Sequence, residues 1–276
     1  MSEYGTIVKR MTYSLAISTC PNDTFMFHAI LEGRIDPGDL DVSIELGDVQ
    51  ELNERVRRGE LDFSKVSCFA AAVLAEQYEI VSAGAALGFG VGPLLLARPG
   101  APALGAGARV ICPGALTTAG LLFRRFFPHV PRAENRVFSE IMPALSRGEA
   151  DYGVVIHEGR FTYQAMGLEL VADLGALWEK EYRLPLPLGC VVASRKLPER
   201  VRHSFSELVR ASVMYGFAHR ADTLATMKRY AQELDEAVIW SHVDLYVNDW
   251  SVDLGSEGRR ALEVFFDLVR NDALAT

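Results

Sequence analysis

Hydrophobic and polar positions alternate in blocks along this chain, and the blocks predict strands and helices in turn. Apolar runs predict strands at residues 13–18, 41–46 and 62–67. Apolar positions on one helical face predict a helix at 49–58, and an Ala-rich segment predicts another at 68–76. Because strands and helices alternate, we expect an α/β protein built from βαβ units with a mostly parallel sheet.

A second block of the same kind surrounds a linker-like segment rich in Pro, Gly and Ala at residues 99–107. Strands are predicted at 93–98 before it and at 109–112 after it, and the β-branched run at 154–156 predicts a buried strand. After Pro198 the pattern becomes helical, with helices predicted at 199–217, 221–234, 236–247 and 256–270.

A six-residue pattern occurs once in each block. Residues 58–63 read Arg-Gly-Glu-Leu-Asp-Phe, and residues 147–152 read Arg-Gly-Glu-Ala-Asp-Tyr. In both copies a helix is predicted to end at the glycine, just before a strand. Chance similarity and a duplicated unit both explain so short a pattern, but the same local architecture is expected twice.

The two blocks predict two lobes with a cleft between them. Residues 13–98 and 195–276 are assigned to the first lobe, and residues 99–194 to the second. The predicted strand at 93–98 carries the chain to the second lobe, and residues 189–194 carry it back. This layout resembles the periplasmic binding proteins of the second topological type.

Composition narrows the class of protein. The chain has 276 residues, of which 49% are hydrophobic, and 28 basic residues against 36 acidic ones give a net charge of −8. No basic stripe with interleaved aromatic residues occurs, so nucleic acid is not expected as a partner. The apolar stretch at 83–97 is too short and too rich in glycine to span a membrane.

Cysteine usage and the amino-terminal residues predict the compartment. The four cysteines are scattered, with no C-x-x-C pair, which argues against a zinc site or a disulfide framework and fits a reducing environment. Residues 1–12 contain no apolar core of signal-peptide length. We therefore predict a soluble cytoplasmic protein, and the pattern favours no particular oligomeric state.

His157 is the most informative polar position, because it directly follows the predicted strand at 154–156. Ligands of open α/β sheets bind beyond the carboxyl ends of the strands. Imidazole titrates near neutral pH and can act there as a general base. An isolated histidine would more simply bond to a neighbouring carbonyl, but the polar cluster that follows, Glu158, Gly159 and Arg160, favours a functional role.

Polar side chains also follow two strands of the first lobe. Asp23 is expected to cap the helix that begins at Phe25, whereas Asn22 has donors and acceptors to spare for a ligand. Lys65 would need a negative partner if buried, either a substrate carboxylate or an internal Asp. Ser67 is suited equally to capping the next helix and to binding a ligand.

In the second lobe, Thr117 and Thr118 precede an apolar helix and follow a turn that contains Gly114. Hydroxyl groups, backbone N–H groups and the positive end of a helix dipole suit a carboxylate, although one threonine alone could simply cap the helix. No phosphate-binding glycine motif stands between a strand and a helix, so no nucleotide cofactor is predicted.

Taken together, these segments resemble the 1,4-dihydroxy-6-naphthoate synthase family, lyases of the futalosine route to menaquinone. The resemblance extends from residue 13 to about residue 270, over nearly the whole chain. Its motifs are Cys20–Pro21–Asn22–Asp23–Thr24–Phe25, Lys65–Val66–Ser67, Thr117–Thr118, Ile156–His157–Glu158–Gly159–Arg160–Phe161–Thr162–Tyr163, and Leu245–Tyr246–Val247–Asn248 with Leu254–Gly255.

This resemblance implies a two-lobed enzyme that uses neither cofactor nor metal and converts cyclic dehypoxanthinyl futalosine, a small-molecule carboxylate. It implies that His157 is the proton acceptor. The substrate contacts that it implies are Lys65, Val66, Ser67, Thr117 and Thr118, with Asn22 and Arg160 as further candidates.

Two other functions remain open from the sequence. The related chorismate dehydratase of the same pathway shares the general fold, but the motif at residues 157–161 favours the synthase. A non-catalytic small-molecule binding protein, either a transporter component or the sensing domain of a regulator, is the other alternative. The expected lack of a signal peptide and of a helix-turn-helix argues against both forms of it.

Overall fold

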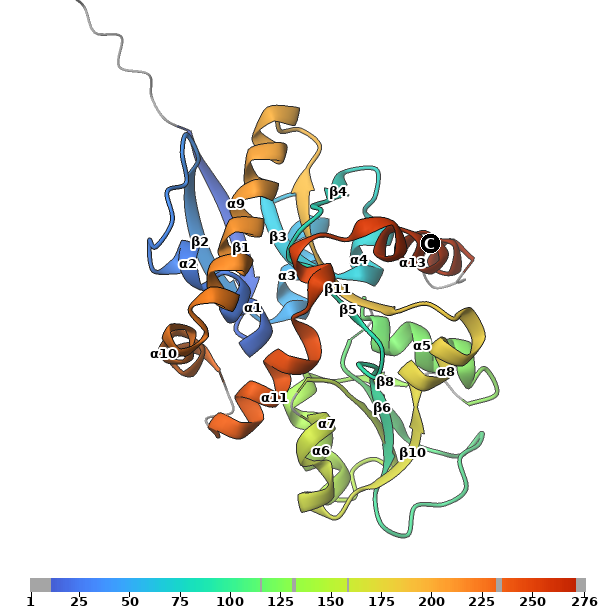
Figure 1. Ribbon diagram of the computed structural model, residues 1–276. Helices are drawn as coiled ribbons and strands as arrows, with labels where there is room; N and C mark the ends of the chain where they lie inside the picture. The colour runs from blue at the N-terminus through green and yellow to red at the C-terminus, as the bar shows by residue number, and fades with distance from the viewer. Residues whose placement is uncertain (1–10, 115, 131–132, 158, 232–234, 272–276) are drawn as a thin grey trace, which may run out of the picture.

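The structure is a computed structural model, and its strands form two sheets (Figure 1). The first sheet lies in the upper half of the molecule in that view and the second sheet in the lower half. The residues that the structure describes are 11–114, 116–130, 133–157, 159–231 and 235–271.

The first sheet has the order β2-β1-β3-β11-β4, with β5 also paired to β11. β1 is parallel to β2 and β3, whereas β11 is antiparallel to β3, β4 and β5. Its strands are β1 (Thr12–Ser18), β2 (Asp41–Gly47), β3 (Phe63–Ser67), β4 (Tyr78–Ile80), β5 (Ala86–Gly88) and β11 (Leu186–Ser194).

Nine helices accompany this sheet in the described part of the chain. They are α1 (Pro21–Met26), α2 (His28–Leu31), α3 (Val49–Arg57), α4 (Cys68–Val73), α9 (Glu199–Ala218), α10 (Arg220–Tyr230), α11 (Glu236–Tyr246), α12 (Asp249–Val252) and α13 (Gly255–Arg270). α13 packs against α4 and β11, and α11 packs against α1 and β5. The helix predicted at 221–234 ends at Tyr230, and residues 232–234 of that prediction lie outside the described residues.

The second sheet has the order β10-β6-β9-β7-β8. β9 is parallel to β7 and antiparallel to β6. The elements of this lobe are β6 (Leu94–Ala97), β7 (Val110–Cys112), α5 (Thr118–Phe126), β8 (Glu134–Asn135), α6 (Phe138–Ser146), β9 (Tyr152–Val155), α7 (Gly159–Thr162), a 3-10 turn (Tyr163–Met166), β10 (Glu169–Asp173) and α8 (Leu174–Tyr182).

The chain crosses between the sheets twice, once between β5 and β6 and once between α8 and β11. By their pairing, β6 belongs to the second sheet and β11 to the first. We therefore propose lobe boundaries near residues 89–93 and 183–185, each about one strand away from the positions predicted from sequence. β6 and β11, the strands that follow the two crossovers, are antiparallel to all their neighbours, so the expectation of a mostly parallel arrangement is wrong.

The six-residue pattern that occurs twice forms the same turn in both lobes. α3 has its C-cap at Arg58 and α6 at Arg147, and the next residues, Gly59 and Gly148, have φ angles of +71° and +72°. Glycine adopts this left-handed conformation without steric cost, as the sequence prediction required. The turns lead into β3 and β9, and these two strands carry the chain into the site described below.

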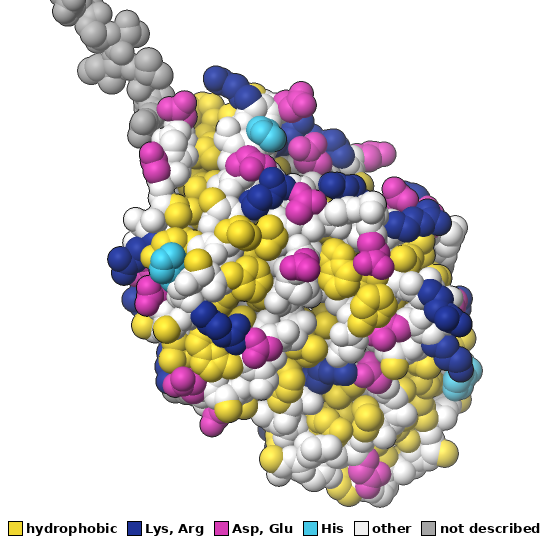
Figure 2. Space-filling view, in the orientation of Figure 1, with side chains coloured by type: hydrophobic (Ala, Val, Ile, Leu, Met, Phe, Trp, Pro, Cys, Tyr) yellow, Lys and Arg dark blue, Asp and Glu magenta, His cyan; other side chains and the backbone are white. Residues whose placement is uncertain are grey.

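The surface agrees with the mixed charge of the sequence. Acidic and basic side chains are interspersed over the face shown in Figure 2. In the described part of the chain, no helix has the length and apolar character needed to cross a membrane.

Candidate active site

A cavity lies between the two lobes and has about 720 Å³ of open space, including the part that opens to solvent. This volume falls within the range of small-molecule sites. Of the predicted site residues, Arg160 alone is missing from its wall. The polar side chains that line it come from the first lobe (Ser18, Asn22, Asp23, Lys65, Ser67, His242, Tyr246) and from the second (Thr117, Thr118, His157).

His157 lies two residues after the end of β9, at the strand end where its sequence context placed it, and its backbone is in the left-handed region with φ +56°. Residues other than glycine rarely adopt this conformation, and strained backbone of this kind clusters at functional sites. The half-buried imidazole reaches the other lobe, where Nδ1 lies 3.4 Å from the Sγ atom of Cys20. It also packs edge-on against the Phe138 ring at 4.9 Å between centroids.

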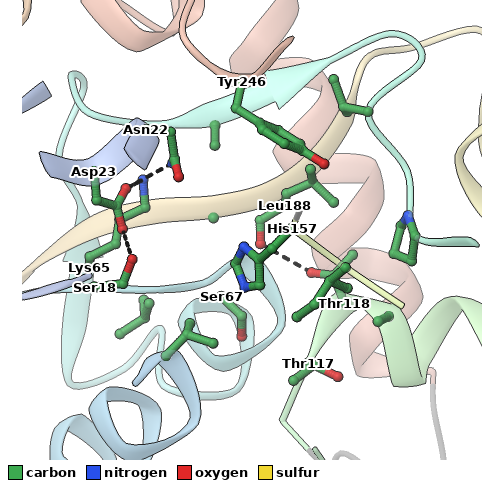
Figure 3. A pocket seen from close by; sticks show the side chains of 18 of the residues that line it. Ser18, Asn22, Asp23, Lys65, Ser67, Thr117, Thr118, His157, Leu188 and Tyr246 are labelled. Carbon is green, nitrogen blue, oxygen red and sulfur yellow. Dashed lines mark hydrogen bonds and ion pairs between the residues drawn. The ribbon is translucent and has the colours of Figure 1, made fainter. Parts of the chain in front are cut away.

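Lys65 forms a buried ion pair with Asp23. The Lys65 Nζ and Asp23 Oδ1 atoms are 2.8 Å apart, and the two side chains are 4% and 3% exposed. Nζ also donates to the Gly84 carbonyl, and the other Asp23 oxygen accepts from the Ser18 hydroxyl (Figure 3). Of the two partners considered for Lys65, the internal Asp is therefore the one present.

The expectation that Asp23 caps its helix is wrong. α1 has Cys20 at its N-cap, and no side chain caps it. Asp23 instead lies inside the first turn and faces Lys65, because an unpaired buried ammonium would cost more than a lost helix cap contributes.

Asn22 links this ion pair to a histidine that the sequence did not single out. Its Nδ2 atom donates to Asp23 Oδ1 at 3.0 Å, and its Oδ1 atom lies 3.0 Å from Nε2 of His242. His242 is 1% exposed, and burial lowers its pKa well below the usual value. A positive charge on His157 would lower that pKa further.

The sequence signal for His242 is weak. It lies on α11 among the buried residues Ile239 and Val243, as a histidine packed in the core also would. Its position at the site depends on the packing of α11 against α1, and this contact cannot be predicted from the residues near His242 in the sequence.

Both threonines of the second lobe line the cavity where α5 begins. Thr117 caps the helix, since its hydroxyl accepts from the Gly120 N–H at 3.1 Å and donates to the Gly114 carbonyl at 2.8 Å. The Thr118 hydroxyl donates to the Leu188 carbonyl at 3.3 Å. The capping role is thus confirmed for Thr117, and the amino terminus of α5 faces the cavity.

Ser67 has a capping role as well, and it joins the lobes. Its hydroxyl accepts from the Ala70 N–H at the start of α4 and donates to the carbonyl of Leu116, at 2.6 Å. Asn53 donates to the same carbonyl at 3.1 Å. Leu116 belongs to the loop that precedes α5, so these bonds connect the two lobes beside the cavity.

Arg160 lies outside the cavity wall. Its guanidinium pairs with Asp173 at 2.7 Å and donates to the Gly92 carbonyl at 2.5 Å. These contacts hold the segment after His157 against the first crossover. No group of three or more His, Cys, Asp or Glu side chains within the described ranges could hold a metal ion.

Two α/β lobes joined by two crossovers, with a polar cavity between them, define a protein with the periplasmic-binding-protein-like fold. Solved structures agree with this fold. An alkanesulfonate-binding protein from Xanthomonas axonopodis pv. citri superimposes with a TM-score of 0.69 at 14% identity, covering 96% of this chain and 94% of its own. A structural-genomics protein from Archaeoglobus fulgidus matches with a TM-score of 0.88 at 30% identity, covering 94% and 97%.

The chain belongs to the menaquinone biosynthesis family, whose model matches residues 13–271. A 1,4-dihydroxy-6-naphtoate synthase from Thermus thermophilus is 44% identical over 91% of this chain and 92% of its own length. A protein of the same name from Streptomyces coelicolor is 40% identical over 91% and 90%. The resemblance found in the sequence is thereby confirmed, and the protein is placed among enzymes.

Proposed function

We propose that this protein is a 1,4-dihydroxy-6-naphthoate synthase, a carbon–carbon lyase that converts cyclic dehypoxanthinyl futalosine, with His157 as the proton acceptor. The observation that carries this proposal is the position of His157, in a strained turn at a cavity shared by both lobes. The names of the two relatives support the same reaction. We further propose that the enzyme works in the cytoplasm without an added cofactor.

The proposed reaction requires one general base. Release of a dihydroxynaphthoate requires a carbon–carbon bond to break and a ring to become aromatic, and proton abstraction by a neutral imidazole can start the fragmentation. A positioned base of this kind contributes about 10²–10⁴-fold in rate. Because burial lowers the pKa of the neighbouring His242, that ring stays neutral and does not repel the imidazolium that forms on His157.

The amino terminus of α5 is the proposed anchor for the substrate carboxylate. Thr117 and Thr118 line the cavity there, and the helix dipole favours a negative charge at this end. The Lys65 ammonium is already paired with Asp23, so we assign the carboxylate to α5. Lys65, Val66 and Ser67 would then serve as the facing wall that orients the ring toward His157.

Direct conversion tests the reaction. Purified full-length protein is mixed with cyclic dehypoxanthinyl futalosine without added cofactor, and 1,4-dihydroxy-6-naphthoate is followed by chromatography with mass detection. Product over many turnovers is expected. Binding without product would favour a non-catalytic binding protein, and neither binding nor product would make chorismate the next compound to assay.

The role of His157 is tested by His157→Asn. We expect turnover to fall at least about 100-fold, since the base is lost, while substrate binding stays measurable by calorimetry. His219→Asn is the matched control, because His219 lies on the surface and bonds within its own helix. Activity of His157→Asn at the level of the control would remove His157 from the mechanism.

A further inference from the structure

The His242 ring presents a buried acceptor at the cavity wall. Nδ1 of this ring is buried and has no hydrogen-bond partner among the described residues, and the side chain lines the cavity. His28 also has one ring nitrogen without a partner in the described part of the chain, but it does not line the cavity. The location of the His242 atom, beside the proposed substrate, is what distinguishes it.

The tautomer of His242 follows from the hydrogen bonds around it. The Asp23 carboxylate is paired with Lys65 and can only accept, so the Asn22 atom that faces it must be the donor Nδ2. Asn22 Oδ1 is then the atom that faces His242, and it requires a proton on Nε2. Nδ1 is consequently left with a lone pair.

We propose that Nδ1 of His242 accepts a hydrogen bond from a hydroxyl group of the bound substrate and so helps to select and orient it. The identity of the substrate rests on the proposed function. The relay from Lys65 through Asp23 and Asn22 makes His242 a preorganised acceptor, because each bond in it has one possible direction. A ligand without a hydroxyl at this place would leave the buried nitrogen unpaired.

His242 and His157 then have separate tasks. The two rings are nearly parallel, with 6.0 Å between centroids and 11° between planes, so one ligand can contact both. Burial lowers the pKa of His242, and a charge on His157 lowers it further, so His242 accepts the hydrogen bond without taking the proton. The proton transferred in the reaction goes to His157.

Two substitutions separate contact with the ligand from support of Asn22. In His242→Gln, the longer amide places a donor near the former Nε2 atom, which keeps the bond to Asn22 and removes the acceptor. In His242→Asn, the shorter amide places an oxygen near the former Nδ1 atom, which keeps the acceptor and gives up the bond to Asn22. Each variant therefore keeps one of the two functions of the ring, the bond to Asn22 or the acceptor for the ligand, and loses the other.

The measurement is kcat/KM for cyclic dehypoxanthinyl futalosine, with thermal unfolding as the check of folding. We expect His242→Gln to lose about 10-fold, as for one neutral hydrogen bond, and His242→Asn to stay within about threefold of the wild type. The opposite order would show that His242 only supports Asn22. Equal activity or equal loss in the two folded variants would also overturn the proposal.

A second measurement uses the unaltered protein, so it stands even if a variant fails to fold. Nitrogen NMR of the full chain with ¹⁵N-labelled histidine is recorded with and without 1,4-dihydroxy-6-naphthoate as the probe. We expect His242 to show the Nε2–H tautomer and its Nδ1 resonance to move when the probe binds. An Nδ1–H tautomer, or an Nδ1 chemical shift that stays the same when the probe binds, would overturn the proposal.

Failure of the proposed function would be visible separately. If the wild type binds cyclic dehypoxanthinyl futalosine but does not convert it, the lyase activity is wrong, and the Gln and Asn variants are compared by their affinity for the probe instead. The same order of the two variants is expected there, and the reverse order would overturn the role of His242.

Discussion

The charges nearest to the cavity form a pair that is almost fully removed from solvent. Lys65 and Asp23 depend on each other, since either charge alone would be left almost out of contact with solvent and without a partner of opposite charge. We expect Lys65→Met to lower the free energy of unfolding by about 3–5 kcal/mol, measured by urea denaturation. The double variant with Asp23→Asn should recover a large part of that loss, because no uncompensated charge remains.

An ion pair on the surface provides the control for this comparison of single and double variants. The side chains of Arg260 and Glu263 are 65% and 64% exposed, so Arg260→Met should change the free energy of unfolding by less than about 1 kcal/mol. Additive effects of the Lys65 and Asp23 substitutions would contradict the coupling that the geometry implies.

What the sequence could predict at this scale depends on how local the signal is. His157 was identifiable because a buried strand ends in front of it, and the need of Lys65 for a negative partner followed from burial alone. His242 and the contact of Cys20 with His157 were not identifiable. His242 lies 220 positions from Asn22, and only the packing of α11 against α1 brings the two together. Cys20 and His157 are 137 positions apart, and only the packing of the two lobes brings them together.

The first crossover shows how closely two elements approach. A Cβ atom added to Gly92 would lie 2.2 Å from the backbone of Gly175, at the start of α8. We expect Gly92→Ala to lower the free energy of unfolding by about 1–3 kcal/mol or more, because backbone cannot move aside as a side chain can. It should also reduce turnover, since Arg160 bonds to the Gly92 carbonyl just after His157.

Gly107→Ala is the matched control for this substitution, since nothing lies within 4 Å of an added Cβ atom there. It should be neutral or slightly stabilising in chemical denaturation. Equal stability of the two variants would mean that the crossover is more adaptable than this close contact implies.

Helices and strands were predictable where the pattern of buried and exposed side chains can be read from consecutive residues. The strands β1, β2 and β3 were found near their predicted positions. β3 is buried throughout, β2 alternates between more and less exposed residues, and β1 is buried from Leu15 onward, so each pattern can be read from consecutive residues. β10 was missed because its first three residues are exposed at a sheet edge, and β5 because its three residues lie in a glycine-rich segment. The antiparallel direction of β6 and β11 was missed as well, because each strand enters its sheet directly after a crossover from the other lobe.

The whole molecule is held in one arrangement by contacts that cross between its lobes. Leu116 of the second lobe accepts hydrogen bonds from Asn53 and Ser67 of the first, and His157 reaches Cys20 in the same way. The cavity walls are therefore complete when the lobes are together. The two-lobed class itself was predictable, because it depends on the order of blocks along the chain rather than on any single contact.

Stability of the whole molecule should fall as the pH is lowered from about 7 to 5. Burial lowers the pKa values of His28 and His242, so the unfolded chain takes up protons near pH 6.5 that the folded chain does not bind. Their contribution to stability is complete above the unfolded pKa. For each histidine, up to about 1.4 kcal/mol is lost per pH unit below it, until the folded pKa is reached.

Thermal unfolding midpoints between pH 8 and pH 5 measure this effect. His28→Gln should flatten the decrease, because one of the two histidines no longer titrates in the unfolded chain, whereas the surface substitution His219→Gln should leave the slope as it is. Asp151 affects stability in a lower pH range. The Arg109 guanidinium holds its pKa below the usual range, so its contribution to stability is lost only as the pH falls below about 4. A midpoint that rises between pH 7 and pH 5 would therefore contradict the neutral, buried state of His28 and His242, and with it the division of tasks between His242 and His157.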